Sequence, residues 1–314
     1  MNLENLTELT RDLKTLAMNC GCVATGVCEI SVTDESDTEI YNRWIDAGRH
    51  GKMEYLTRNN EVRQDPEKLL QGAKSMIVCL FAYPTAHNHV AGVPYISSYA
   101  MGRDYHKALR KALTPVVKYI RQLGEEARVC IDSAPLRERY WAQQAGLGYP
   151  GLNGRLISPV AGCDFFIASV ITTLRLKADK PIPTHTCLEC GRCIKACPNG
   201  ALDGHGGMDA RRCISYQTIE NRDEIPRNFN LAGHIFGCDL CSEVCPLSAR
   251  PGTTPIIADL ITRPDMATLS LADWLAMTPD VYETLFNGTP VRRASLEKLQ
   301  STARRLLKHK ISEE

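Results

Sequence analysis

The apolar positions of the first 180 residues follow two periods, one typical of helices and one typical of buried strands. An amphipathic N-terminal helix is predicted by the helical spacing of Leu6, Leu9, Leu13 and Leu16. An apolar run at residues 76–83 predicts a buried strand, residues 127–131 are a short strand candidate, and the β-branched residues of 165–173 predict another buried strand. Further helices are expected at residues 105–123, with an interruption near Pro115, and at residues 136–145, ending at Gly146.

The pattern changes after residue 180. A turn-like K-P-I-P occupies residues 180–183, and residues 185–249 are dense in Cys and Gly. A helical pattern then returns at Leu296, Leu299, Ala303 and Leu306. We therefore predict an α+β protein with three parts: residues 1–180, a cysteine-rich domain at 181–250, and a helical tail at 251–314 that packs on the core.

Composition and charge narrow the class of protein. The 314 residues are 44% hydrophobic and 23% charged, which is typical of a globular chain, and the formal net charge is +1. A global attraction to nucleic acid or membranes is therefore not implied, so an anionic partner needs a local basic patch. The start, Met1 to Lys14, has no apolar secretory core, and no run reaches ~18 apolar residues.

Cysteine usage points to metal ligation. There are 14 cysteines, and eight of them lie between Cys187 and Cys245. Disulfide frameworks usually belong to short secreted chains, whereas this chain is long and without a secretory signal. We therefore expect a cytoplasmic protein whose clustered cysteines bind metal and do not form disulfides.

The clustered cysteines follow a ferredoxin-like spacing. Residues 187–198 read C-L-E-C-G-R-C-I-K-A-C-P, the C-x2-C-x2-C-x3-C-P run in which the fourth cysteine serves a second cluster. A second group, residues 238–246, reads C-D-L-C-S-E-V-C-P and lacks a nearby fourth ligand, for which Cys213 is the candidate. The spacing predicts two [4Fe–4S] clusters with interleaved ligands. The first set is Cys187, Cys190, Cys193 and Cys245, and the second is Cys197, Cys213, Cys238 and Cys241.

Two alternatives remain at this point. Paired C-x2-C motifs also bind zinc tetrahedrally, although four cysteines followed by proline favour iron–sulfur clusters. Two neighbouring clusters indicate a one-electron relay, and the preceding 180 residues exceed what a carrier needs. An electron acceptor is therefore expected in the N-terminal part, and a non-enzymatic electron carrier or scaffold is the alternative.

Several segments resemble epoxyqueuosine reductases, the cobalamin-dependent iron–sulfur enzymes of queuosine tRNA modification. Besides the first cysteine run, the matching segments are residues 98–110 (SYAMGRDYHKALR), 131–148 (IDSAPLRERYWAQQAGLG), 209–220 (DARRCISYQTIE), 237–246 (GCDLCSEVCP) and 288–294 (GTPVRRA). The resemblance implies reduction of epoxyqueuosine to queuosine at the wobble position of tRNA, by two electrons and two protons, with release of water.

The same resemblance implies an architecture and partners. A cobalamin-binding α/β domain with a nitroreductase-like sheet would precede a bacterial-ferredoxin-like two-cluster domain. The cobalamin would be base-off, because the D-x-H at residues 104–106 lacks the glycine of His-ligated corrinoid domains. An external low-potential electron donor and a monomeric state are also expected. A related corrinoid iron–sulfur reductase, dehalogenase-like and acting on a small molecule, is the alternative.

Site residues are implied by motif position. Asp132, in the family's V/I-D-x-x-P motif, would be the proton donor, with a pKa raised by an apolar corrin. The alternative reading is that Asp132 caps a helix beginning near Pro135. The expected cobalamin contacts are Tyr95, Ser98, Asp132, Asn153, Ser215 and Asp239.

The chain departs from the family pattern at three places. Residues 151–154 read G-L-N-G where members often have G-K-[HN]-T, and Cys163 stands where serine is expected. Longer members also carry a C-terminal helical-repeat domain, for which 314 residues leave no room. If tRNA is the substrate, we expect the remaining surface to hold it.

Residues 291–314 carry seven Arg or Lys against three Glu, a local cluster suited to phosphate contacts. A solvated helix face would look the same. The predicted tRNA contacts are Arg211, Arg212, Arg292, Arg293, Arg304 and Arg305.

Overall fold

The computed structural model describes residues 3–85, 92–182, 187–248 and 257–313. Its centre is a four-stranded sheet in the order β1-β2-β7-β4, and every pairing in it is antiparallel. The strands are β1 (Ala24–Glu29), β2 (Ser75–Ala82), β4 (Ala127–Cys130) and β7 (Phe165–Thr172). This mixed content with an antiparallel sheet confirms the α+β class.

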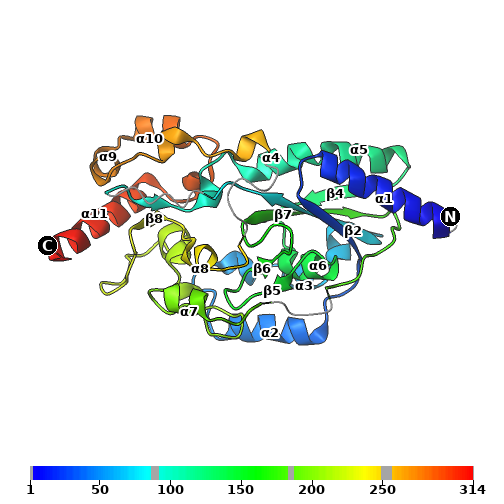
Figure 1. The fold of residues 1–314 in the computed structure, drawn as a ribbon, viewed down its shortest axis with the longest axis horizontal. Coiled ribbons are helices and arrows are strands. Elements are labelled where there is room, and N and C mark those ends of the chain that lie inside the picture. The colour runs from blue at the N-terminus through cyan, green and yellow to red at the C-terminus, as the bar shows by residue number, and fades with distance from the viewer. Residues whose placement is uncertain (1–2, 86–91, 183–186, 249–256, 314) are drawn as a thin grey trace.

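Helices cover both faces of this sheet, as Figure 1 shows. One face packs against α1 (Leu3–Asn19), α4 (Tyr105–Ala112) and α5 (Thr114–Gln122), and the other against α6 (Glu138–Gln144). Successive residues of β2 therefore alternate between two cores: Ile77 belongs to one and Val78 to the other. Burial on both faces explains why β2 is an unbroken apolar run.

Most elements predicted for this part are confirmed. The interruption expected near Pro115 divides residues 105–123 into α4 and α5, because Pro115 lies in the first turn of α5 and lacks the N–H that would continue α4. The helix expected from residue 136 begins at Glu138. Strand β1 was missed, since its sequence A-T-G-V-C-E carries small residues and no clear alternation.

Smaller elements connect the rest of the chain. Strand β3 (Tyr95–Ile96) pairs in parallel with β8 (His234–Phe236), and β5 (Tyr149–Pro150) pairs with β6 (Leu156–Ile157). The remaining helices are α2 (Glu35–Asp46), α3 (Asn60–Gln64), α7 (Arg192–Ala196), α8 (Leu240–Glu243), α9 (Leu271–Ala276), α10 (Pro279–Phe286) and α11 (Leu296–Glu313). In the part of the chain that the structure describes, no helix has the length and apolar character needed to cross a membrane.

The three predicted parts share their cores. Ile96, Phe236 and Trp274, one from each part, belong to a single buried cluster. Within it the Trp274 and Phe286 rings stack at 5.4 Å between centroids and 10° between planes. The C-terminal helices thus pack on the body of the protein, and α1 and α11 lie at opposite ends of its long axis (Figure 1).

A glycine allows β1 to approach α6 closely. A Cβ atom built on Gly26 would lie 2.1 Å from the carbonyl oxygen of Ala145, just after α6. Gly26→Ala is therefore expected to lower the free energy of unfolding by about 1–3 kcal/mol through overpacking. Anaerobic urea unfolding followed by circular dichroism measures this, with exposed Glu29→Ala on the same strand as the control. Equal midpoints for the two variants would contradict the close packing.

Candidate functional site

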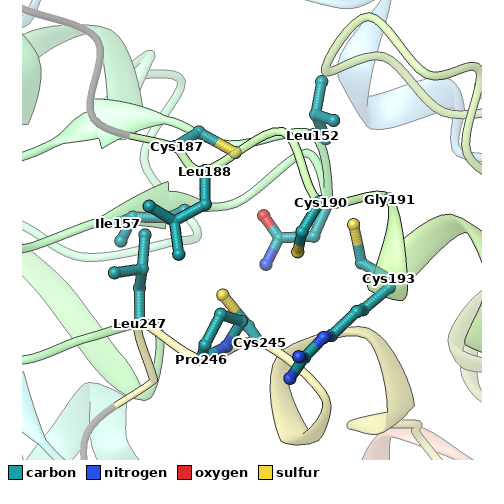
Figure 2. Close-up of a pocket in the computed structure, with 12 residues that line it drawn as sticks. Leu152, Ile157, Cys187, Leu188, Cys190, Gly191, Cys193, Cys245, Pro246 and Leu247 are labelled. Atoms are coloured by element: carbon teal, nitrogen blue, oxygen red, sulfur yellow. The ribbon is translucent and has the colours of Figure 1, made fainter.

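Four cysteines from two distant segments line one pocket. Figure 2 shows the sulfur atoms of Cys187, Cys190, Cys193 and Cys245 turned toward the same space. The pocket holds about 320 Å³ outside protein atoms, part of it open to solvent. Short helices α7 and α8 pack against each other and bring the two segments together. These four residues are the set predicted from spacing for the first cluster, and Asn153 lies in the same lining.

The second predicted set also gathers. Burial, followed by smaller effects of the nearby Cys213 and Cys197, raises the pKa of the Cys241 thiol to about 12. The pKa of Cys238 is likewise raised by burial and then by Cys213 and Cys241. Mutual influence of this kind requires proximity. Because thiolates are the metal-binding form, thiols with raised pKa values deprotonate only as metal binds.

The first cysteine set surrounds a pocket and does not converge on a point. Among the described residues, no three His, Cys, Asp or Glu side chains could hold a single metal ion. The first set instead lines the walls of the pocket in Figure 2, with Leu152 and Ile157 beside it.

A buried carboxylate connects the second cysteine group to β3. Asp239, between Cys238 and Cys241, is 2% exposed. It accepts hydrogen bonds from Tyr95 Oη (2.8 Å), Ser97 Oγ (2.6 Å) and the Ser98 backbone N–H (2.7 Å). Desolvation raises its pKa, but a nearby guanidinium and these donors outweigh that and keep the pKa below its usual range.

The predicted cobalamin contacts therefore fall into separate places. Tyr95, Ser98 and Asp239 lie together and bond to one another. Asn153 is buried in the pocket of the first cysteine set. Ser215 is half-buried and precedes the π-helical turn Tyr216–Glu220. Their role as cofactor contacts stays a prediction.

A half-buried guanidinium that the sequence reading missed lies beside the second set. Arg155 donates to Asp164 Oδ1 at 3.3 Å and to Tyr83 Oη at 3.2 Å. Its positive charge lowers the pKa of Cys241 and of Asp239, against the effect of burial. Arg155 therefore favours negative charge on the second cysteine set.

Asp132 lies directly after β4 in a left-handed backbone conformation, with φ of 46°. Its side chain is 60% exposed. Oδ2 accepts from Tyr105 Oη at 2.6 Å and lies 3.3 Å from His106 Nε2, while the Asp132 backbone N–H donates to Glu138 Oε1 at 2.6 Å. Its carboxyl group is thus held by α4, and its backbone by the first residue of α6.

This geometry corrects two expectations for Asp132. Helix α6 begins at Glu138 after Arg137, and no side chain caps it, so the capping alternative is wrong. Desolvation raises the pKa of Asp132, but hydrogen bonds from His106 and Tyr105 outweigh it, so that the pKa lies below its usual value and not above it. The raised carboxyl pKa belongs to Glu138, at about 8, through burial and then through the Asp132 charge.

Three of the six predicted tRNA contacts, Arg211, Arg292 and Arg293, form ion pairs. Arg211 binds both oxygens of Asp209, at 2.9 and 2.7 Å. Arg293 binds both oxygens of Glu220, at 2.9 Å each. Arg292 forms an ion pair with Glu283, and Arg305 donates a hydrogen bond to the backbone carbonyl of Pro226. The side chains of Arg212 and Arg304 are exposed.

Arg293 lies near the Asp132 site. Its charge contributes to the lowered pKa of Asp132, and its guanidinium carbon lies 5.8 Å from the centre of the Tyr55 ring. Glu220 takes up only part of this charge, because the Arg293 side chain is 54% exposed. Of the six predicted arginines, Arg293 is thus the one whose charge reaches Asp132.

Comparison with known proteins identifies the family. Residues 63–133 match a family model described as "Epoxyqueuosine reductase QueG, DUF1730", and residues 186–248 match a "4Fe-4S double cluster binding domain". The first range contains Asp132, and the second contains all eight clustered cysteines. The cysteine-rich segment is therefore an iron–sulfur segment, and the zinc alternative is not supported.

Similarity extends over nearly the whole chain. The epoxyqueuosine reductase of Leadbetterella byssophila is 36% identical over 303 residues, covering 94% of this chain and 97% of the relative. That of Gloeobacter violaceus is 34% identical and covers 94% of each. A crystal structure of epoxyqueuosine reductase with an epoxyqueuosine-modified tRNA stem loop superposes with a TM-score of 0.87 at 25% identity, covering 96% of this chain and 81% of that one.

The enzyme from Streptococcus thermophilus gives a TM-score of 0.85 at 26% identity, covering 98% of this chain and 81% of its own. Sequence and structure agree along the same length of chain, through the Asp132 segment and both cysteine groups. The chain therefore belongs to the epoxyqueuosine reductase family of oxidoreductases.

Proposed function

We propose that this chain reduces epoxyqueuosine to queuosine at the wobble position of tRNA, using cobalamin that receives electrons through two [4Fe–4S] clusters. The observation that carries the proposal is the similarity that runs unbroken through Asp132 and the eight cysteines. The product and substrate differ by one oxygen, so the reaction needs two electrons and two protons.

The cysteine sets fit two clusters. Cys187, Cys190, Cys193 and Cys245 line one pocket, and the other four cysteines influence one another's pKa values. Four thiolates are the usual ligand set of a [4Fe–4S] cluster. The assignment of ligands between the clusters remains part of the proposal.

A surface suited to a corrin lies between Asp132 and Asp239. The half-buried rings of Tyr99, Tyr105 and Phe166 contact one another, with Tyr105 and Phe166 stacked at 4.2 Å between centroids. The charges of both Asp132 and Asp239 raise the pKa of Tyr99, after the larger effect of burial. A flat, largely apolar macrocycle would pack on these rings, next to the second cysteine set.

Bound cobalamin supplies the low-potential metal chemistry that protein side chains lack. The chain's own contribution is to bind, to orient and to handle protons. Asp132 is exposed and held by Tyr105 and Glu138, so its carboxyl group is available to a substrate oxygen. We propose that Asp132 passes the proton to the departing oxygen.

A tRNA substrate agrees with the arginines of the C-terminal part, of which Arg293 reaches the Asp132 site. Arg292 and Arg293 lie in the turn Pro290–Arg293, and Arg304 and Arg305 lie on α11. A tRNA substrate also accords with a cytoplasmic location. An external low-potential electron donor and a monomeric state complete the proposal.

The direct test uses protein reconstituted anaerobically with iron, sulfide and cobalamin and given an epoxyqueuosine-bearing stem loop. Mass spectrometry of the nucleosides should show queuosine only when cobalamin is present. Bound clusters without corrin binding would indicate an electron carrier. Turnover of an organohalide without queuosine formation would indicate the dehalogenase-like alternative.

The interleaved ligand sets make a sharp prediction for double variants. Cys187 and Cys197 lie in one run but serve different clusters, so changing both to alanine should remove both clusters. Changing Cys187 and Cys245, from the same set, should remove one. Iron and sulfide content and the electron paramagnetic resonance of the reduced protein report the number of clusters, with Cys28→Ala, buried in the core beneath the sheet, as control. One cluster surviving in the first variant would contradict interleaving.

Asp132→Asn should retain iron and cobalamin while queuosine formation falls by about 10²-fold or more, because the amide cannot pass on a proton. Exposed Asp12→Asn on α1 is the control. The measurements are visible absorbance for cofactor loading and single-turnover conversion for rate. A rate near that of the unchanged protein would remove Asp132 as proton donor.

Arg293→Gln should weaken binding of the stem loop and lower the slope of log affinity against log salt by about 1. The matched control is exposed Arg11→Gln on α1. Fluorescence anisotropy at several salt concentrations measures both quantities. Equal slopes for the two variants would show that Arg293 makes no phosphate contact.

A further inference from the structure

The ring of His106 is held between two carboxylates. His106 is the second residue of α4, and Asp104 caps that helix by accepting the His106 backbone N–H at 3.0 Å. On one side of the ring, Nδ1 lies 2.9 Å from Asp104 Oδ1. On the other side, Nε2 lies 3.3 Å from Asp132 Oδ2. The ring also stacks on Tyr105, at 4.2 Å between centroids.

If both ring nitrogens of His106 donate to the carboxylates that face them, the ring carries one proton more than a neutral histidine. A neutral imidazole has a single N–H, whereas an ionised carboxylate only accepts hydrogen bonds. Two nitrogen–carboxylate contacts therefore need two protons. The extra proton belongs to the array of Asp104, His106 and Asp132 and sits on the imidazole or on one of the carboxyl groups.

The surrounding charges place that proton on His106. Its hydrogen bond to Asp132 raises the pKa of His106, burial opposes this, and Asp104 raises it further, so that it lies above the ordinary value of 6.5. The pKa of Asp132 is lowered in turn. The titratable and charged groups that influence Asp132 or His106 from the neighbouring elements are Tyr55, Tyr99, Asp104, Tyr105, Asp132, Glu138 and Arg293.

An ionised Asp132 cannot by itself be the source of a proton. We propose that His106 is the proton store of this site, passing a proton from Nε2 to Asp132 Oδ2 while Asp104 orients the ring through Nδ1. The inference rests on the proposed function and adds the group that recharges Asp132.

The step balances in protons and moves no electrons. The N–H bond at His106 Nε2 breaks, an O–H bond forms at Asp132 Oδ2, and His106 becomes neutral with its remaining proton on Nδ1 toward Asp104. Asp132 then gives this proton to the departing oxygen. His106, whose side chain is 31% exposed, regains a proton from water. Each passage delivers one of the two protons of the reaction.

The pH dependence of turnover tests this step. The relay needs the imidazolium, so the rate should fall as pH rises through the His106 pKa, above 6.5. This fall in rate is the alkaline limb of the pH–rate profile. Asp104→Asn should move the alkaline limb to lower pH, because the variant loses a carboxylate that stabilises the charged His106 ring. His106→Asn should lower the rate by about 10²-fold and abolish the limb, with little change in stem-loop affinity. Exposed His205→Asn is the control.

Titration of His106 itself provides a readout independent of activity. Carbon-13-labelled histidine in the full chain, loaded with oxidised clusters, allows NMR titration, and comparison with His106→Asn assigns the resonance among the eight histidines. The pKa should lie above 6.5 and fall in both Asp132→Asn and Asp104→Asn.

The results separate this inference from the proposed function. If the unchanged protein forms no queuosine, the proposed function fails. If it does so while His106→Asn keeps the rate and the alkaline limb, His106 is not the proton store. If His106→Asn lowers the rate but the alkaline limb of the pH–rate profile stays at the same pH, His106 has only a structural role.

Discussion

The buried carboxylate of Asp239 is the interaction on which the arrangement of the site depends. A charge with 2% exposure is costly to bury unless its oxygens are satisfied, and here three donors from the β3 region satisfy them. Because Asp239 stands between two cysteines of the second set, these bonds fix that set against Tyr95 and Ser98. The parallel pairing of β3 with β8, just before Cys238, also holds these two segments together.

The electrostatics around Asp132 divide proton handling among different groups. Asp132 and Glu138 are neighbouring carboxyl groups whose environments push their pKa values apart, down for exposed Asp132 and up, to about 8, for half-buried Glu138. Below that value Glu138 is largely neutral, which limits repulsion with Asp132, and its oxygen still accepts the Asp132 backbone N–H. Ionised Asp132 faces His106 on one side and the aromatic surface on the other.

The cysteine sets could be predicted because their spacing is local and each short run supplies several ligands. Strand β2 was equally clear, since burial on both faces makes it an unbroken apolar run. The surroundings of Asp132 could not be read in this way. Tyr105 lies 27 positions away and meets Asp132 only because α4 packs over the end of β4 and β7. Desolvation was expected to decide the pKa of Asp132, whereas hydrogen bonds across that packing decide it.

The state of the basic cluster also could not be predicted from the sequence, because it depends on contacts between distant segments. Counting arginines predicted a positive patch, but Glu220, Asp209 and Glu283 neutralise much of it from other segments. Strand β1 also depends on tertiary contacts, such as the approach of Gly26 to Ala145.

The central claim is that thiols from two separated segments hold a pair of iron–sulfur clusters beside the Asp132 site. Mössbauer spectroscopy of the unchanged chain, enriched in iron-57 and kept anaerobic, tests it most directly. The account predicts two [4Fe–4S] clusters per chain. A single cluster, or zinc bound in place of iron, would contradict it.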